Sequence, residues 1–483
     1  MTDTAVPTII PTLLHGPVDL TRLHFVGLGG TGMAPLARVC AERGLSVSGS
    51  DLHPSAALDA LSDLGVSVFI GHHARQVPAD ATAVVITHAI DEANPEVRAA
   101  GLRDIPVVHR STVLDGLMRG HIAIGVLGTH GKTSTTGMLA QALAGMGEEP
   151  SYVIGGDLDG PLSGGSLGRR GGVFVAEVDE SDRTHTAVSV NVAVICNIEH
   201  DHVENYAGLA QHIDAYEEFV RGMRPGGLVV LNIDSSATRE LAARIVMMES
   251  GPRLVTYGFG SGATWRIASA STSSGRSTAH VSAPGGVDFT LTLEAPGLHQ
   301  LRNATAAMAV LHGLGHPTAD VMAQLALFKN VQRRMSVACE DRGVRVYDSY
   351  AHHPTEVRAD LAAAQSVASA GQVIVVLQAP DAARVQAFGA QFGEALAGAD
   401  TVVLTDNVRP LGDDMLAELA AHVTAAGGLV CRVEKERAAA VTHAYELAQL
   451  GDVVVLMGTG DIVAHGRELA PGQPAAGAVV AAA

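Results

Sequence analysis

The clearest chemical signal lies in residues 125–136, which read GVLGTHGKTSTT. An apolar run beginning at His121 precedes this stretch and is predicted to be a buried strand. A helical pattern follows, with Leu139, Leu143 and Met146 on one face. Strand, glycine-rich turn, Lys-Thr and helix is the context in which phosphate-binding loops occur. Backbone N–H groups of such a loop converge on phosphate oxygens, and the helix N-terminus adds positive potential. The stretch therefore predicts a nucleotide-phosphate site.

Two side chains of this loop suit phosphate chemistry. Lys132 can neutralise the β- and γ-phosphates, and the Thr133 hydroxyl can hold Mg²⁺. The strict pattern GxxxxGK[ST] is not met, because Val126 stands where its first glycine belongs. From the loop alone, a tight strand–helix turn with an incidental lysine stays open as the alternative. The residues expected to line the phosphates are Gly128, Thr129, His130, Gly131, Lys132, Thr133 and Ser134.

Acidic clusters follow the next two predicted strands. The strand at 173–177 ends in Glu177, Asp179, Glu180 and Asp182, and the strand at 192–198 ends in Glu199, His200, Asp201 and His202. Open α/β sheets bind ligands at the carboxyl ends of their strands. Hard oxygen donors beside a phosphate loop favour Mg²⁺. A zinc pair at His200 and His202 is disfavoured, because no cysteine or further histidine lies nearby at the usual spacing.

The N-terminal segment contains a second glycine turn. A predicted strand at 23–26 runs into GLGGTG at 27–32, a helix extends to about Arg43, and a second strand ends at Asp51. This is the start of a βαβ unit, and Asp51 follows the turn at the distance where an acidic group meets a ribose. A packed turn without a ligand stays open. A dinucleotide-dependent oxidoreductase would rest on this turn alone and would leave the Lys132 loop unexplained.

The elements that must position these residues alternate between strand and helix along the chain. Further buried strands are predicted at 344–348, 373–377, 401–404 and 453–457, which indicates largely parallel sheets. Residues 264–293 alternate like an antiparallel edge or flap. With 483 residues, three domains are expected. We predict α/β units at 1–120, 121–330 and 331–483, the outer two Rossmann-like, with a frayed tail after Glu468.

Composition narrows the classes of partner. The net charge of −18 argues against a nucleic-acid partner, so polyphosphate binding must be local. No signal peptide or membrane span is apparent, and Cys40, Cys196, Cys339 and Cys431 form no CxxC pair. We expect a cytoplasmic protein with reduced thiols and small-molecule substrates, existing as a monomer or weak homodimer.

Taken in order, the motifs resemble those of the Mur ligases, the ATP-dependent amide ligases of peptidoglycan precursor synthesis, and within that family the alanine-adding members most. The matching segments are GLGGTGM at 27–33, SGSD at 48–51, NPE at 94–96, HR at 109–110, GTHGKTSTT at 128–136, EVDESD at 177–182, NIEHDH at 197–202, RRM at 333–335 and YAHHPTE at 350–356. The resemblance implies an N-terminal domain for the UDP group, a central P-loop ATPase and a C-terminal Rossmann-like domain.

The resemblance also implies a mechanism and roles. A UDP-N-acetylmuramate-type carboxylate attacks the γ-phosphate of ATP to give an acyl phosphate, which an amino acid amine then displaces. Lys132 and Mg²⁺ balance the charge, with Thr133 and Glu177 holding one Mg²⁺ and His202 a second. Arg334 would reach the phosphates from the C-terminal domain. The UDP-substrate side would be formed by Gly29, Gly30, Thr31, Asp51 and Arg110.

Three positions depart from the family pattern. In GxHNxxNA, which meets the adenine, Asn303 is kept and Gln300 replaces the first Asn. In DDYxHHP, the second Asp, associated with the nucleotide ribose, is Ser349. Asp348 is kept and expected in the ATP site. In the acceptor segment at 378–388, Arg384 is kept, and Asp381 stands where the family has a base. We expect Arg384 to bind the carboxylate of the incoming amino acid and Asp381 to favour an acceptor with a second cationic or donor group.

These departures leave alternatives to an ordinary amide ligase. One is a paralogue with a changed acceptor or donor in specialised metabolism. Another is a non-catalytic nucleotide-binding protein, which the joint presence of Lys132, Thr133, Glu177 and His202 disfavours.

Overall fold

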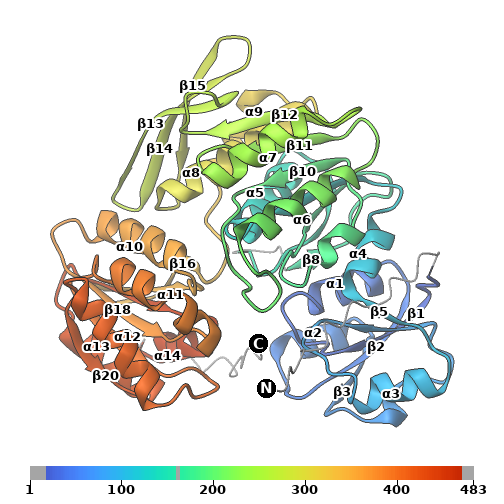
Figure 1. The fold of residues 1–483 in the computed structure, drawn as a ribbon, viewed down its shortest axis with the longest axis horizontal. Helices are drawn as coiled ribbons and strands as arrows, with labels where there is room; N and C mark the ends of the chain where they lie inside the picture. Colours follow the sequence, from blue (N-terminus) through green and yellow to red (C-terminus); the bar gives the residue numbers. More distant parts are fainter. Residues whose placement is uncertain (1–17, 159–163, 470–483) are drawn as a thin grey trace, which may run out of the picture.

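The computed structural model describes residues 18–158 and 164–469, which form three α/β units in chain order (Figure 1). The N-terminal unit is a five-stranded parallel sheet of order β3-β2-β1-β4-β5. Its elements are β1 (Arg22–Val26), α1 (Ala34–Glu42), β2 (Ser46–Asp51), α2 (Ala56–Asp63), β3 (Ser67–Ile70), β4 (Ala83–Ile86), α3 (Pro95–Leu102), β5 (Val107–His109) and α4 (Arg110–Met118).

The central unit contains a ten-stranded sheet of order β15-β14-β13-β12-β11-β10-β6-β9-β7-β8. Its first half comprises β6 (Ile122–Leu127), α5 (Lys132–Gly145), β7 (Ser151–Val153), β8 (Gly165–Ser166), β9 (Val173–Glu177), β10 (Val192–Ile195) and α6 (Leu209–Arg221). Its second half comprises β11 (Leu228–Asn232), α7 (Ser236–Val246), β12 (Arg253–Gly258), β13 (Trp265–Ser273), β14 (Arg276–Ala283), β15 (Val287–Leu293), α8 (Leu298–Gly313) and α9 (Thr318–Leu325). The antiparallel edge predicted from the alternation at 264–293 is confirmed by the pairing of β13, β14 and β15.

The C-terminal unit is a six-stranded sheet of order β16-β17-β21-β18-β19-β20, parallel except for the edge strand β16. Its elements are β16 (Arg334–Asp341), β17 (Val344–Ser349), α10 (Pro354–Ala368), β18 (Val373–Gln378), α11 (Ala382–Leu396), β19 (Thr401–Thr405), α12 (Asp413–Ala425), β20 (Val430–Val433), α13 (Arg437–Leu447), β21 (Val453–Met457) and α14 (Ile462–Glu468). Parallel sheets covered by helices confirm the predicted fold class. Most of the predicted tail, 470–483, lies outside the described residues.

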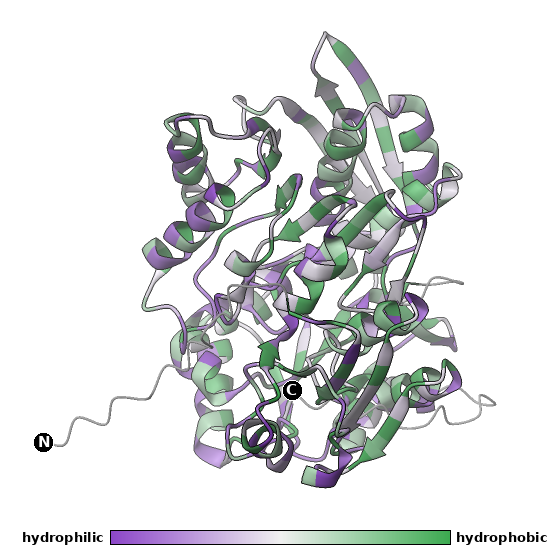
Figure 2. Cartoon of the chain, turned by 90° about the vertical axis from the view of Figure 1, so that its right-hand side faces the viewer, coloured by the Kyte–Doolittle hydropathy of each residue, from purple (hydrophilic) through white to green (hydrophobic). Residues whose placement is uncertain are grey.

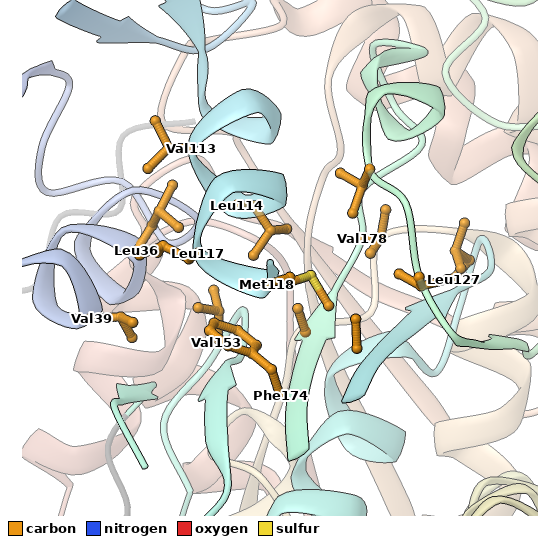
Figure 3. Packing of buried hydrophobic residues seen from close by; sticks show 14 of the residues in the cluster. Leu36, Val39, Val113, Leu114, Leu117, Met118, Leu127, Val153, Phe174 and Val178 are labelled. Carbon is orange, nitrogen blue, oxygen red and sulfur yellow. The ribbon is translucent and has the colours of Figure 1, made fainter. Parts of the chain in front are cut away.

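The buried apolar residues show how the units are joined. One core cluster runs from the N-terminal unit into the central sheet, joining Leu36 on α1 and Leu117 on α4 to Val153 and Phe174 on β7 and β9 (Figure 3). The buried residues of the C-terminal unit form two separate clusters, on the two faces of its sheet, and Val203 of the central unit packs against the edge of one of them. In Figure 2 hydrophobic colouring follows the strands, whereas the helices alternate between hydrophobic and hydrophilic residues. The N-terminal and central units therefore share a core that the C-terminal unit does not enter.

The structure describes the side chains of three of the four cysteines that were predicted to be reduced. Cys40, Cys196 and Cys339 are free and buried, and the side chain of Cys431 lies outside the described set. Burial raises the pKa of Cys40 to about 12 and that of Cys196 to about 11, so both stay protonated at neutral pH.

Candidate active site

The predicted phosphate loop lies between β6 and α5. Gly128 and Gly131 have φ values of 132° and 85°, in the region that favours glycine. A Cβ at Gly128 would lie 3.0 Å from the Cβ of Cys196, so the turn also packs tightly against the following strand end. Val126 is fully buried within β6 and pairs with Val194 and Glu177. It belongs to the strand, which explains why no glycine is required there.

Lys132 is the first residue of α5 and is held in place by the loop itself. Its Nζ donates to the carbonyl of Gly128 at 2.7 Å and to the Glu180 carboxylate at 3.0 Å. Burial opposes the ammonium charge, but the carboxylates of Glu180 and Asp179 outweigh it and hold the pKa of Lys132 above its ordinary value. The loop therefore presents a fixed cation.

The two residues predicted for the first Mg²⁺ meet beside this lysine. The Thr133 hydroxyl donates to Glu177 Oε2 at 2.9 Å, and the Gly155 N–H donates to the same oxygen at 2.9 Å. Arg334, at the start of β16, reaches the Thr133 hydroxyl at 3.4 Å. Oxygen donors are the ligands that Mg²⁺ prefers, so the donor set at this point fits that ion.

His202 lies on the loop after β10, with a φ of 49°. Its ring nitrogens are 3.6 Å from Asp201 and 3.7 Å from Glu204. Burial lowers the pKa of His202, but Glu204 and Asp201 more than compensate and raise it, with smaller contributions from Glu180 and Asp179. His202 thus lies within electrostatic range of the acids around Lys132, and its role as a metal ligand remains a prediction.

A histidine–carboxylate cluster joins the phosphate loop to α10, and sequence reasoning missed it. His130 Nδ1 is 3.2 Å from Glu356 and its Nε2 is 3.6 Å from Glu199. His353 lies 3.8 Å from Glu199, whose carboxylate also accepts a hydrogen bond from Thr355 at 2.6 Å. The motif YAHHPTE places His353, Thr355 and Glu356 near one another in sequence, but it does not indicate that they lie opposite the phosphate loop.

His130, Glu199 and His353 have donor atoms within 4.8 Å of one another, a spacing compatible with a metal ion. His130 is also close to a carboxylate outside this group, that of Glu356. Burial lowers the pKa of His130, but Glu356 and Glu199 raise it to about 10, which makes the ring a cation at neutral pH. The imidazole of His130 therefore pairs with one carboxylate of the central unit and one of the C-terminal unit.

The residues predicted to bind the nucleoside of ATP do not lie together in the structure. Asn303 and Gln300 are buried in the first turns of α8, where Asn303 Oδ1 faces Gly131 of the phosphate loop. Asp348 does not fit the predicted nucleotide role. It points to the opposite face of the C-terminal sheet, toward α14, where its Oδ2 is 3.9 Å from Arg467 and its Oδ1 has no hydrogen-bond partner. Successive side chains of a strand alternate between faces, so Asp348 and Ser349 cannot share one.

The predicted UDP-substrate residues lie in the N-terminal unit. The Gly29 N–H donates to the Asp51 carboxylate at 2.8 Å, which places the acid against the turn formed by Gly29, Gly30 and Thr31. The guanidinium of Arg110 occupies the space that a side chain at residue 32 would need, and it pairs with Asp179 at 2.5 Å. Arg110 thus connects this unit to the acids beside Lys132.

The predicted acceptor residues form a pair at the start of α11. Asp381 caps the helix by accepting from the Arg384 N–H at 3.0 Å, and its carboxylate takes an Arg384 guanidinium hydrogen bond at 2.6 Å. The same guanidinium donates to both oxygens of Asp201, at 3.0 and 3.2 Å. One guanidinium therefore serves two carboxylates, Asp381 of its own helix turn and Asp201 of the central unit.

Comparison with known proteins identifies the family of the chain. Residues 22–122 match the Mur ligase family, catalytic domain, residues 126–311 the Mur ligase middle domain, and residues 333–460 the Mur ligase, glutamate ligase domain. The chain belongs to the Mur ligase family, as the motif series predicted. No helix among the described residues is long and apolar enough to cross a membrane.

Among its relatives, a UDP-N-acetylmuramate–L-alanine ligase of Streptomyces avermitilis is 41% identical, over 94% of this chain and 97% of that protein. The enzyme of that name from Mycolicibacterium smegmatis is 38% identical over 94% and 95%. The crystal structure of a UDP-N-acetylmuramate–alanine ligase from Thermotoga maritima superposes with a TM-score of 0.78 at 30% identity, covering 92% of this chain and 97% of that one.

Proposed function

We propose that this protein is an ATP-dependent ligase that activates a UDP-N-acetylmuramate-type carboxylate and joins it to an amino acid. The observation that carries the proposal is the convergence at the phosphate loop. Lys132 is fixed there as a cation, and Arg334 arrives from the C-terminal unit within 3.4 Å of Thr133. Two cations from different units at one phosphate site suit a reaction that brings two anions together.

In the first step, an oxygen of the substrate carboxylate forms a bond to the γ-phosphorus of ATP. The bond between this phosphorus and the bridging oxygen breaks, and that oxygen leaves with ADP. In the second, the amine nitrogen bonds to the acyl carbon, the bond from that carbon to the phosphate oxygen breaks, and the nitrogen loses a proton. Lys132 and Arg334 stabilise the charge that develops on the transferred phosphoryl group. We expect contacts between the central and C-terminal units to keep water from the acyl phosphate during the reaction.

Magnesium fits the oxygen donors of Thr133 and Glu177, and we propose His202 as a ligand of a second ion. Mg²⁺ bound there supplies positive charge to the phosphate oxygens. Glu177 is already oriented by hydrogen bonds from Thr133 and Gly155, so the chain positions this ligand before the ion arrives.

We assign the UDP-sugar to the N-terminal unit and the incoming amino acid to the C-terminal unit. Gly29, Gly30, Thr31, Asp51 and Arg110 would hold the UDP-sugar. The carboxylate of the incoming amino acid would replace Asp381 on the Arg384 guanidinium, because the Asp381 side chain is 51% exposed whereas that of Asp201 is 3% exposed. Release of Asp381 would leave a free carboxylate beside the acceptor, which favours amino acids with a cationic or donor group.

The test is ADP release with UDP-N-acetylmuramate and a panel of amino acids, comparing the parent with Lys132→Ala. We expect a loss of at least about 10²-fold in kcat, because the γ-phosphate charge goes unneutralised. Lys435→Ala is the matched control, since that lysine is exposed in the C-terminal unit. Near-normal turnover of Lys132→Ala would refute the phosphate-loop assignment, and alanine as the best acceptor would refute the changed-acceptor form.

A further inference from the structure

A buried carboxylate lies beside the position where the family pattern has lost one. The Ser349 hydroxyl, on the face of β17 toward α10, donates to Asp360 Oδ2 at 2.5 Å. Asp360 belongs to α10, and its side chain is 14% exposed. Its carboxylate therefore lies on the sheet face that Ser349 occupies and that Asp348 does not.

Asp360 faces the central unit as well as its own. Its Oδ1 is 3.9 Å from Nε2 of His299, in the first turn of α8. Burial lowers the pKa of His299 to about 4, so the ring is neutral and does not pair with the acid as a cation. At 3.9 Å the ring nitrogen is also beyond hydrogen-bond distance, so Asp360 Oδ1 has unused acceptor capacity on that side.

The surroundings of Asp360 follow the path that a nucleotide would take from the phosphate loop. One turn earlier on α10, Glu356 contacts His130 of the loop at 3.2 Å and Arg334 at 3.7 Å. On α8, Asn303 lies against Gly131, and His299 is one turn closer to the helix start. Asp360 and His299 thus lie side by side, each one helical turn beyond a residue that touches the loop.

We propose that Asp360 accepts hydrogen bonds from the ribose hydroxyls of the nucleotide whose phosphates bind the 128–134 loop. The inference rests on the proposed function, because it requires ATP at that loop. The two oxygens of a carboxylate match the adjacent 2′- and 3′-hydroxyls of a ribose, which is how acidic residues bind this sugar in other nucleotide sites. The Ser349 hydroxyl orients the group from behind.

The competing explanation is a purely structural link, in which Asp360 only ties α10 to the end of β17. The two explanations differ in their dependence on the ligand. A structural link affects every nucleotide alike, whereas a ribose acceptor affects only nucleotides that carry the hydroxyls.

The experiment measures dissociation constants of ADP and 2′,3′-dideoxy-ADP by calorimetry with the full-length parent, Asp360→Asn and Asp360→Ala. The measurements are made at pH 8, where Asp360 is ionised although burial raises its pKa to about 7. We expect Asp360→Ala to weaken ADP binding at least about tenfold, as for loss of hydrogen bonds to a charged group, and to leave dideoxy-ADP binding within about twofold. Asp360→Asn keeps a partner for Ser349 and guards against misfolding. Asp320→Ala, an exposed acid on α9, is the matched control and should change neither constant.

A second variant moves the carboxylate back into the strand. The exchange Ser349→Asp with Asp360→Ser should restore the preference for ADP over dideoxy-ADP, which a structural role would not predict. If both nucleotides weaken equally in Asp360→Ala and Asp360→Asn, the ribose inference is wrong while the proposed function stands. If the parent binds no ADP at all, the proposed function itself is wrong, and the inference fails with it.

Discussion

The central unit meets its two neighbours through junctions of opposite character. Toward the N-terminal unit the contact is apolar, with Leu36 and Leu117 packed in the same core as Val153 and Phe174 (Figure 3). Toward the C-terminal unit the described contacts that connect the two sheets are mainly charged or polar. They include Arg334 with Thr133, Glu356 with His130, Thr355 with Glu199, and Arg384 with Asp201. A hollow of about 420 Å³, lined in part by Glu199 and His353, lies along this second junction.

The contrast between the apolar and the polar junction predicts which pair of units can move apart. Burial of apolar side chains fixes two units in one arrangement, because separating them exposes that surface to water. Charged contacts between units can be exchanged for contacts with charged substrates at smaller cost, and small polar interfaces within a chain permit relative motion. The residues proposed to bind ATP and the acceptor lie at the polar junction. We therefore expect this junction to open for substrates and to close with Arg334 at the phosphate loop, as in the arrangement described here.

The largest effect on stability should come from the apolar junction. Leu117 is 1% exposed, and Leu117→Ala leaves a cavity in the shared core. We expect a loss of about 2–5 kcal/mol in the free energy of unfolding, with kcat unchanged at temperatures where the variant is folded. Chemical unfolding and initial rates measure the two quantities. Leu102→Ala, at an 88% exposed position, is the control, and a loss of kcat in folded Leu117→Ala would contradict the division of roles.

The polar junction should show the reverse pattern. Arg334→Ala removes the cation that the C-terminal unit brings to Thr133, and we expect kcat to fall about 10²-fold. Stability should change by about 1 kcal/mol or less, because the Arg334–Glu356 contact is long, at 3.7 Å. Arg266→Ala, on the exposed face of β13, controls for loss of an arginine. An Arg334→Ala protein with a normal rate but a lower unfolding temperature would assign this arginine to structure.

The sequence was sufficient to predict those parts of the site that are formed by a single continuous segment. The glycines, Lys132 and Thr133 adopt their arrangement within a single strand–turn–helix, and Glu177 follows because adjacent parallel strands end at one edge. The partners across the polar junction were not predictable in this way. Arg384 meets Asp201 from 183 residues away, and Glu356 meets His130 only because α10 docks on the loop. Asp348 was misassigned because an aspartate next to the lost one in sequence lies on the other face of the sheet.

The last prediction concerns the pH dependence of stability at the polar junction. Burial raises the pKa of Asp360 to about 7, with the Glu356 charge adding to the shift and Ser349 and Arg334 opposing it. His299, facing it from α8, is neutral. The unfolded chain loses this proton near pH 4, as aspartates ordinarily do, whereas the folded protein retains it until about pH 7. Below the ordinary aspartate pKa, this group does not lower the free energy of unfolding. As the pH rises from there to 7, the free energy of unfolding falls progressively, because the unfolded chain releases the proton more readily than the folded protein.

Asparagine is neutral throughout this range and does not carry that penalty. The unfolding temperature of Asp360→Asn minus that of the parent should therefore increase from pH 4 to pH 8, and should level off above pH 8. Leu117→Ala should lower the unfolding temperature by a similar amount at both ends of the range, since no titrating group is changed. Differential scanning calorimetry without nucleotide measures both differences. A constant difference for Asp360→Asn would show that the folded protein releases this proton as readily as the unfolded chain, and that Asp360 is not held in the buried environment described for it.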